Sequence, residues 1–227
     1  MDINPTNVIE CHGTEGKLAA SWCLWEKYQS TQHQTRENYA DNLKIIYRFN
    51  TLNGLAALWK HTPYGKPSKL LYDKPNTLSK KFIAEKDEEE LIIEFLVLFK
   101  EGVKPEWEDP QNKNGCSLHV EIKDATPEQI DKIWKSLVFG LVGGTLPYSE
   151  KIMGIRMLDR LKKHDCLKCE VWTSFPCRTS TKDIEIINNT MKSIDELTDH
   201  LHLLYSEIFD LSVHSIILKD HYVASKI

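Results

Sequence analysis

The order of apolar and polar residues along the chain predicts several β-strands. Residues 41–49 and 118–122 alternate apolar and polar side chains, which is the period of a sheet with one covered face. Residues 18–28 carry large apolar side chains and end in a polar run at 29–38, so we expect a strand followed by an exposed loop. Further strands are predicted at residues 91–99, 152–161, 168–175 and 213–218. The charged residues at the start of 91–99 also allow a helix there.

Capping residues predict the helices. Thr51 caps a helix that runs to about Thr62 and ends at Pro63. Residues 126–129, Thr-Pro-Glu-Gln, combine an N-cap, a first-turn proline and a capping-box glutamine, and the helix that they open stops at the glycine pair 143–144. Residues 193–196, Ser-Ile-Asp-Glu, form a second capping box, so we expect another helix to begin there.

Strands in consecutive hairpins, with about three interspersed helices, predict an α+β fold in which helices cover one face of an antiparallel sheet. We expect residues 18–227 to form a single domain that follows a flexible N-terminal segment at residues 1–17. Residues 64–90 are rich in Lys, Pro, Ser and Glu, which predicts an inserted extended loop with room for one charged helical turn.

The composition argues against several classes of protein. The chain has 227 residues, 41% of them hydrophobic, and a formal net charge of -4, so it is not coated in positive charge for indiscriminate nucleic-acid binding, and any RNA contact must be local. The N-terminal residues show no apolar run after basic residues, and no run reaches the length of a membrane span, so we expect neither a signal peptide nor a membrane protein. The six cysteines are scattered, which favours reduced thiols in a cytoplasmic or nuclear compartment.

A tryptophan flanked by carboxylates stands between two predicted strands, in the sequence Pro105-Glu106-Trp107-Glu108-Asp109. A core tryptophan normally has apolar neighbours, so we expect this ring near the surface. The residues alone leave two interpretations open, because such a ring either packs on its own domain or belongs to a binding site.

The motifs around this loop, taken in order, resemble the eukaryotic translation initiation factor 4E family over most of the chain. The matching segments are Ser21-Trp22-Cys23-Leu24-Trp25, Tyr39-Ala40-Asp41-Asn42-Leu43, residues 98–109, Asn112-Lys113-Asn114-Gly115, Ile130-Asp131-Lys132-Ile133-Trp134, Gly154 with Arg160, and Val171-Trp172-Thr173. The run at 98–109 is the most specific. The resemblance implies a strongly curved antiparallel sheet backed by about three α-helices, with the 7-methylguanosine cap of messenger RNA bound in its concave face.

Three residues are implied to hold the base of the cap. Trp107 matches one of the two aromatic rings that sandwich the methylated guanine, and Tyr39 falls where the family usually has the other, a tryptophan. Glu108 matches the carboxylate that accepts hydrogen bonds from N1 and N2 of guanine. Methylation at N7 makes guanine cationic, so each ring adds cation–π attraction of about 1–2 kcal/mol to stacking. Losing that charge is expected to cost about 2–4 kcal/mol, or roughly 30- to 1000-fold in affinity.

The rest of the cap is implied to meet a basic turn and a strand. Arg160, Lys162 and Lys168 fall where the family neutralises the phosphates of the cap, and Trp172 matches a tryptophan that touches the N7-methyl group. Arginine grips phosphate oxygens in bidentate fashion, whereas lysine supplies a point charge. Without the resemblance, the basic turn at 160–165 would be interpreted as a solvated hairpin.

The chain departs from the family pattern on its helical side. There the family binds a helical peptide of a scaffold, initiation factor 4G-like in this case, or of a repressor, through an exposed tryptophan on the first helix. That position is Ala56 here, with Trp59 three residues on, and a neighbouring groove position is Lys135, whereas Leu52 and Phe139 keep apolar character. We therefore expect a partner surface with altered chemistry. Tyr39 is a second departure, since tyrosine is the weaker cation–π partner.

Two alternatives to a cap-binding factor in translation initiation remain open. The first is a divergent relative that acts mainly as a protein adaptor or translational repressor with weak cap binding. The other alternative is a metal-dependent enzyme or a structural zinc site built from His164, Cys166, Cys169 and Cys177, because Cys-x-x-Cys is a zinc-ligand spacing. The chain has no phosphate-cradling glycine loop and no nucleophilic serine motif, so we expect neither an enzyme nor a cofactor.

Overall fold

The computed structural model of the protein describes residues 8–11, 16–28, 42–71, 82–83, 90–91, 93–160, 166–178, 180–208 and 215–221. Eight strands in these ranges form one sheet, in the order β1-β3-β2-β6-β8-β9-β7-β10. They are β1 (Ile9–Cys11), β2 (Lys17–Tyr28), β3 (Leu43–Thr51), β6 (Ile93–Lys100), β7 (Cys116–Ile122), β8 (Ile152–Asp159), β9 (Leu167–Thr173) and β10 (Ile216–Asp220). Two short strands, β4 (Phe82–Ile83) and β5 (Glu90–Leu91), pair with each other.

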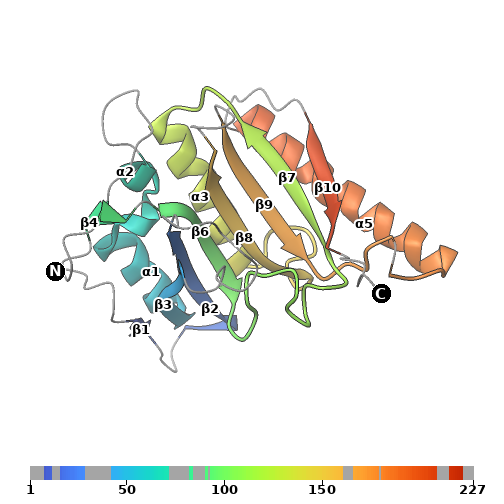
Figure 1. The fold of residues 1–227 in the computed structure, drawn as a ribbon, viewed down its shortest axis with the longest axis horizontal. Helices are drawn as coiled ribbons and strands as arrows, with labels where there is room; N and C mark the ends of the chain where they lie inside the picture. Colours follow the sequence, from blue (N-terminus) through green and yellow to red (C-terminus); the bar gives the residue numbers. More distant parts are fainter. Residues whose placement is uncertain are drawn as a thin grey trace.

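Neighbouring strands of the large sheet are antiparallel, except that β1 runs parallel to β3. The helices are α1 (Leu52–His61), α2 (Ser68–Leu71), α3 (Pro127–Val142) and α5 (Ile184–Leu203). Figure 1 shows a curved sheet with α3 and α5 together on one side of it. The predicted fold class, a curved antiparallel sheet backed by helices, is confirmed. We call the opposite side, toward the viewer in Figure 1, the front face.

Two of the predicted helix starts are confirmed by their hydrogen bonds. The Thr51 hydroxyl accepts from the Gly54 backbone N–H at 3.1 Å, which caps α1. At α3, the Thr126 hydroxyl accepts from the Gln129 N–H while the Gln129 side chain accepts from the Thr126 N–H, which is the reciprocal capping box. None of the described helices has the length and apolar character that crossing a membrane requires.

The predicted start of the last helix is wrong. The helix begins at Ile184, where the Asp183 carboxylate accepts from the N–H groups of Glu185 and Ile186. Ser193 therefore lies inside α5, and its hydroxyl donates to the backbone oxygen of Asn189 at 3.1 Å. A serine inside a helix can satisfy its hydroxyl by donating to a backbone oxygen one turn earlier. The Ser-x-x-Glu pattern therefore does not mark a helix start here.

Residues 64–71, the first part of the predicted inserted loop, are packed, and α2 forms the one helical turn for which the prediction leaves room. A short 3-10 helix at Pro63–Gly65 and α2 follow α1 directly. The backbone oxygen of Tyr64 accepts from Nε1 of Trp134 at 2.9 Å, and the Ser68 hydroxyl donates to the Asp131 carboxylate at 2.8 Å. These contacts tie the segment to α3, so distant partners, rather than its polar composition, decide its structure.

Other boundaries differ in smaller ways. Residues 93–100 form β6, so the strand interpretation of 91–99 is confirmed over the helical one. β1 lies in the N-terminal segment that the pattern does not mark as a strand, and it is held by pairing with β3. The last strand begins at residue 216, and the predicted residues 213–214 lie outside the described part, as do the predicted loop at 29–38 and residues 161–165 of the basic turn.

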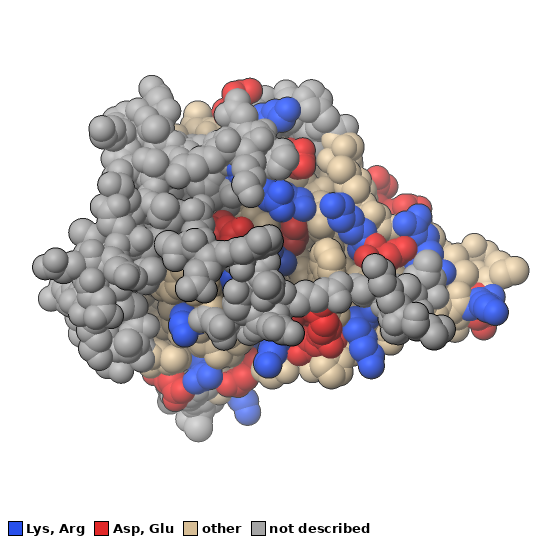
Figure 2. All heavy atoms as spheres, in the orientation of Figure 1, with Lys and Arg blue, Asp and Glu red and all other residues tan. Residues whose placement is uncertain are grey.

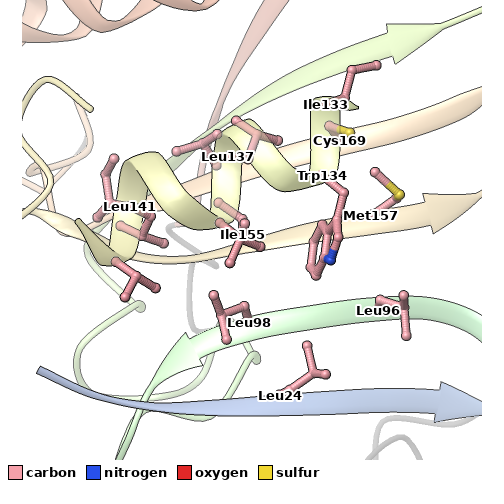
Figure 3. Packing of buried hydrophobic residues seen from close by; sticks show 14 of the residues in the cluster. Leu24, Leu96, Leu98, Ile133, Trp134, Leu137, Leu141, Ile155, Met157 and Cys169 are labelled. Atoms are coloured by element: carbon pink, nitrogen blue, oxygen red, sulfur yellow. The ribbon is translucent and has the colours of Figure 1, made fainter. Parts of the chain in front are cut away.

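The main core lies between the sheet and α3 (Figure 3). Strand side chains from β2, β6, β8 and β9 meet one side of the helix, and all of them are buried: Leu24, Leu96, Leu98, Ile155, Met157 and Cys169 from the strands, and Ile133, Trp134, Leu137 and Leu141 from α3. Burying a large apolar side chain stabilises a fold by about 1.5–3 kcal/mol, so this layer fixes the sheet on its helices.

A second apolar cluster lies on the front face and contains no helical residue. Its members are strand or loop residues: Leu43, Phe95, Val97, Phe99, Val103, Met153, Leu158 and Trp172, with Trp25 packed against them. The Phe99 and Trp172 rings meet edge to face, with centroids 5.5 Å apart. The front face therefore has an aromatic floor of its own.

Gly154 makes room for this floor, and its replacement is the first test of the packing. Gly154 lies opposite Phe99, and a Cβ built on it would lie 2.0 Å from Cδ2 of Phe99 and 2.5 Å from the backbone oxygen of Leu98. Since a strand oxygen cannot move without the sheet, Gly154→Ala is expected to lower the free energy of unfolding by about 3 kcal/mol or more, measured by urea denaturation.

Gly102→Ala is the matched control, because it adds the same methyl group where nothing lies within 4 Å. Gly102 has a φ of +83°, so its replacement is expected to cost about 1–2 kcal/mol through backbone strain alone. A loss at Gly154 no larger than that at Gly102 would contradict the packing argument.

Candidate functional site

Side chains alternate across β9, and this alternation places charged residues on the front face. Cys169 and Val171 belong to the core under the helices. Lys168, Glu170 and Trp172 therefore point to the other side, since successive strand residues point to opposite faces. Figure 2 shows lysine, arginine, aspartate and glutamate mixed on the part of this face that is not drawn in grey, rather than gathered by sign.

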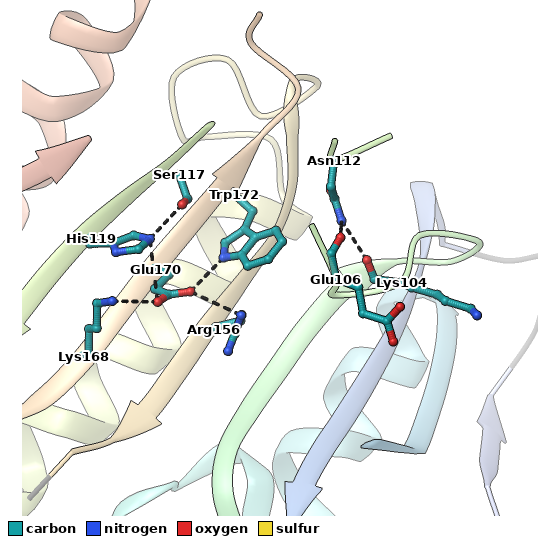
Figure 4. A network of polar contacts seen from close by, with 9 residues as sticks. All are labelled: Lys104, Glu106, Asn112, Ser117, His119, Arg156, Lys168, Glu170 and Trp172. Carbon is teal, nitrogen blue, oxygen red and sulfur yellow. Dashed lines mark hydrogen bonds and ion pairs between the residues drawn. The ribbon is translucent and has the colours of Figure 1, made fainter. Parts of the chain in front are cut away.

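Glu170 is the centre of a buried polar network (Figure 4). Its carboxylate accepts from Nζ of Lys168 at 2.9 Å and from Nε1 of Trp172 at 2.9 Å. Nη1 of Arg156 on β8 lies 3.6 Å away, and Nε2 of His119 on β7 lies 3.7 Å away. One carboxylate thus links side chains from three adjacent strands.

The charges of this network follow from burial and from the neighbouring cations. Burial lowers the pKa of His119 to about 4, so its imidazole is neutral at neutral pH. Burial alone would raise the pKa of Glu170, but Arg156, together with His119 when protonated, Lys168 and the Trp172 N–H, lowers it to about 2. At neutral pH the site therefore holds an ionised carboxylate between two cations.

The residue types Ser117, His119 and Glu170 are those of a hydrolytic triad, but their geometry differs from one. The Ser117 hydroxyl and the Glu170 carboxylate both approach Nε2 of His119, at 2.7 and 3.7 Å. In a triad the serine and the acid use different ring nitrogens. Nδ1 of His119 is buried without a hydrogen-bond partner among the described residues. This arrangement does not activate the serine.

The loop that carries Trp107 is held by one buried asparagine. Nδ2 of Asn112 donates to the backbone oxygens of Lys104 and Glu106, at 2.7 and 2.9 Å (Figure 4). The Asp109 carboxylate accepts from the Lys104 N–H at 2.9 Å and closes the same loop. Trp107 sits between these anchors with 44% of its surface exposed. The ring is therefore presented by a fixed loop and not buried in the domain.

His221, which follows β10, lies against both tryptophans of the front face. Its ring is nearly parallel to Trp107, with centroids 6.3 Å apart, and tilted against Trp172 at 4.5 Å. Its Nδ1 lies 3.0 Å from the backbone oxygen of Asn112, which can only accept, so Nδ1 carries the proton. Burial lowers the pKa of His221, which favours the neutral ring.

The structure brings some of the predicted site residues together. Trp107 and Trp172 both contact His221, and Trp172 is joined to Lys168 through Glu170. Glu108 is exposed beside Trp107. Arg160 opens the turn after β8, where its N–H donates to the Cys166 oxygen at 3.1 Å. Tyr39 and Lys162 lie outside the described residues.

Sequence reasoning missed four members of the site. Arg156, His119 and Glu170 sit on strands, and the polar residues that alternate with apolar ones along each strand are the signal that would identify them. No local signal points to His221, because its partner Asn112 is 109 positions away in the chain. Lys168 remains a predicted phosphate contact, although its ammonium group is buried in an ion pair here.

The predicted partner residues lie on the helical side. Trp59 of α1 and Phe139 of α3 meet edge to face, with centroids 4.8 Å apart. Nζ of Lys135 lies 5.8 Å from the Phe139 ring centroid. Leu52, Ala56 and Lys135 are exposed. Two helices therefore present one apolar surface with a lysine at its edge.

The described cysteines do not form a metal site. No three His, Cys, Asp or Glu side chains among the described residues are placed to share an ion. Cys169 packs in the helix-side core, while Cys166 and Cys177 are also buried as free thiols. His164, the fourth residue of that hypothesis, lies outside the described part.

The fold and site define an α+β binding protein with an aromatic, charged front face and a helical back. The family described as Eukaryotic initiation factor 4E matches residues 17–215, which is most of the chain. The protein belongs to the eukaryotic initiation factor 4E family.

Relatives of known name agree with this assignment. Eukaryotic translation initiation factor NCBP of Triticum aestivum is 29% identical over 185 residues, covering 82% of this chain and 64% of that protein. The NCBP of Oryza sativa subsp. japonica is 27% identical over 206 residues, covering 90% of this chain and 74% of the other. The chain thus spans less than two thirds of the length of the Triticum aestivum relative.

Solved structures share the fold at low identity. The complex of Ascaris suum eIF4E-3 with m7G cap has a TM-score of 0.60 and 18% identity, covering 94% of this chain and 95% of that chain. The complex of C. elegans eIF4E-3 with the 4E-binding protein Mextli has a TM-score of 0.59 and 19% identity, covering 94% and 97%. The likeness at these identities concerns the fold.

The network around Glu170 makes the stability of the fold depend on pH. Between about pH 6.5 and 4 the unfolded chain binds a proton at His119 that the folded chain excludes, so the free energy of unfolding is expected to fall by roughly 3 kcal/mol as pH drops through this window. Below it, protonation of Glu170 in the unfolded chain continues the loss toward about pH 2.

Urea denaturation at several pH values between 7 and 4 measures this effect. His119→Gln is expected to reduce the slope, while His61→Gln, at an exposed position, leaves it unchanged. His221, whose pKa is also lowered by burial, contributes to the slope that remains in His119→Gln, and Glu170 contributes as the pH approaches 4. An identical slope in wild type and His119→Gln would show that the buried histidine is not responsible.

Proposed function

We propose that this protein binds the 7-methylguanosine cap of messenger RNA on its front face and acts in translation initiation. The observation that carries the proposal is Trp107, a half-exposed ring on a hydrogen-bonded loop with a carboxylate, Glu108, next to it. Family membership supports it, since relatives of the same fold were crystallised with m7G cap and with m7GpppA.

Trp107 is suited to a cationic base. His221 lies near one face of its ring, and a neutral imidazole there adds no positive charge that would repel methylguanine. A delocalised cation stacked on the exposed side gains both dispersion and attraction to the aromatic quadrupole. Glu108 accepts the two adjacent N–H donors of guanine in the same plane, a pair that adenine does not present. Tyr39 is assigned as the second ring of the sandwich on the resemblance alone.

The phosphates are assigned to the end of the β8–β9 hairpin. Arg160 opens this turn, and Lys162 follows it in the sequence. Cations at this end of the hairpin stabilise a triphosphate locally. The rest of the molecule needs no excess of positive charge, in keeping with the net charge of -4.

The helical side supports a second function, binding of a partner peptide. The apolar surface of Leu52, Trp59 and Phe139 is exposed in part on α1 and α3, which is the geometry that receives an amphipathic helix. Solved structures of this fold include complexes with the 4E-binding protein Mextli and with 4E-BP. An initiation factor 4G-like scaffold or a repressor peptide is the proposed occupant, and Lys135 favours an acidic residue in it.

Isothermal titration with m7GTP and GTP tests cap binding. Wild type is expected to prefer m7GTP by roughly 30- to 1000-fold, because only the methylated base is cationic. Trp107→Leu and Glu108→Gln are each expected to lose about tenfold or more for m7GTP, whereas Trp59→Leu on the helical side stays within twofold. Equal affinity of wild type for both nucleotides would favour the adaptor alternative. Unchanged affinity in Tyr39→Ala would place the second ring elsewhere.

Replacement of Phe139 tests the partner surface. Phe139→Glu is expected to weaken binding of a Mextli fragment about 10- to 100-fold, since it places a charge on the apolar surface that the peptide would cover. Ile186→Glu on α5 is the matched control, because Ile186 is 43% exposed and Phe139 is 39% exposed. Both variants are expected to bind m7GTP like wild type. A larger loss in Ile186→Glu than in Phe139→Glu would move the partner surface to α5.

A further inference from the structure

The Glu170 network holds more positive than negative charge. The side chains of Arg156 and Lys168 are each 10% exposed, and that of Glu170 is 6% exposed. His119 is neutral at neutral pH, because burial lowers its pKa to about 4. Two buried cations therefore share one buried carboxylate among the described residues. Buried charge is stable only when it is paired, so this face is suited to a further anion.

Arg156 is the cation with hydrogen-bonding capacity to spare. A guanidinium group has five N–H donors, and among the described side chains the carboxylate contact of Arg156 is Nη1 to Glu170 at 3.6 Å. Its Nε is buried and has no hydrogen-bond partner among the described residues. The group is also held in place, because its Cζ lies 4.4 Å above the Phe95 ring centroid and 5.1 Å from that of Trp172.

The strand register places Arg156 next to the base site. In the β8–β9 pair, Gly154 is opposite Trp172, Arg156 opposite Glu170 and Leu158 opposite Lys168. At about 3.3 Å per residue, Arg156 lies one side-chain repeat, about 7 Å, beyond the level of Trp172, and Arg160 lies about 13 Å further toward the turn. Arg156 is thus the basic side chain of β8 nearest to Trp172 in register.

We propose that Arg156 binds the first phosphate of the cap, the one attached to the ribose of methylguanosine, and that Glu170 is the positioning residue that orients its guanidinium. This inference rests on the proposed cap binding at Trp107 and Trp172. Arg160, at the turn, then contacts the outer phosphates. Two N–H groups of the Arg156 guanidinium match two oxygens of one phosphate, while another N–H of the same group remains directed at the Glu170 carboxylate. Lys168 remains paired with Glu170 on the same face and adds to the positive charge of the site.

A phosphate series separates this role from a structural one. Affinities are measured for 7-methylguanosine, m7GMP, m7GDP and m7GTP by isothermal titration. Arg156→Met is expected to bind the nucleoside within twofold of wild type and m7GMP about tenfold more weakly. Arg160→Met is expected to bind m7GMP within twofold and m7GTP about tenfold more weakly. The proposal is overturned if Arg156→Met binds m7GMP as wild type does, or loses the nucleoside to the same extent.

Two further variants keep the test decisive if Arg156→Met does not fold. Arg156→Lys retains the cation beside Glu170 but loses the fork, and it is expected to bind m7GMP several-fold more weakly with the nucleoside unaffected. Arg156→Met with Glu170→Gln removes one charge of each sign, so the buried net charge equals that of wild type. If net charge alone mattered, this double variant would bind m7GMP normally, which would also overturn the proposal.

Failure of this inference is distinct from failure of the proposed function. If wild type binds GTP and m7GTP equally, the proposed cap binding itself is contradicted. If wild type prefers m7GTP but the Arg156 variants bind m7GMP as wild type does, cap binding stands and only the role of Arg156 is contradicted. Urea denaturation of each variant shows whether a loss of affinity accompanies a loss of the fold.

Discussion

The buried carboxylate of Glu170 is the constraint on which the front face depends. It is surrounded by Arg156 and Lys168 and receives the N–H of Trp172, so it fixes three side chains of neighbouring strands at once. Removing one partner of a buried ion pair costs about 3–5 kcal/mol, because the remaining charge stays in a medium that cannot solvate it. The orientation of Trp172 is therefore set by electrostatics as well as by the packing of Phe99 against it.

The second constraint is the alternation of side chains through the sheet. On β8, Ile155 and Met157 enter the core beneath α3, and the intervening Arg156 reaches the front face. A shift of one residue in register would bury the arginine under the helix and expose both apolar side chains. The hydrophobic layer in Figure 3 thus holds the charged network of Figure 4 in position, although the two lie on opposite sides of the strand.

Much of this architecture is predictable from local pattern. Two-residue periodicity indicates the central strands, and the N-cap at Thr51 and the capping box at Thr126 mark two helix starts, because these signals depend on neighbours in the sequence. One error is local, because Ser193 looks like a cap but its hydroxyl is satisfied inside a longer helix. Distant contacts decide the structure of the polar segment after α1, which is fixed by Asp131 and Trp134 of α3. The family resemblance supplied Trp107 and Trp172, whereas His221, whose partner Asn112 is 109 positions away, needed the fold.

The two proposed binding surfaces occupy opposite sides of one sheet. The residues proposed to bind the cap lie on β9, on the β6–β7 loop and on the turn after β8, while Trp59 and Phe139 lie on the helices behind. A ligand on one side therefore does not obstruct the other. The intervening core is densely packed, and packed layers move between discrete arrangements rather than bending continuously. The same strands support both surfaces. A partner bound on the helices is therefore expected to change the affinity for the cap only if it shifts β8 or β9.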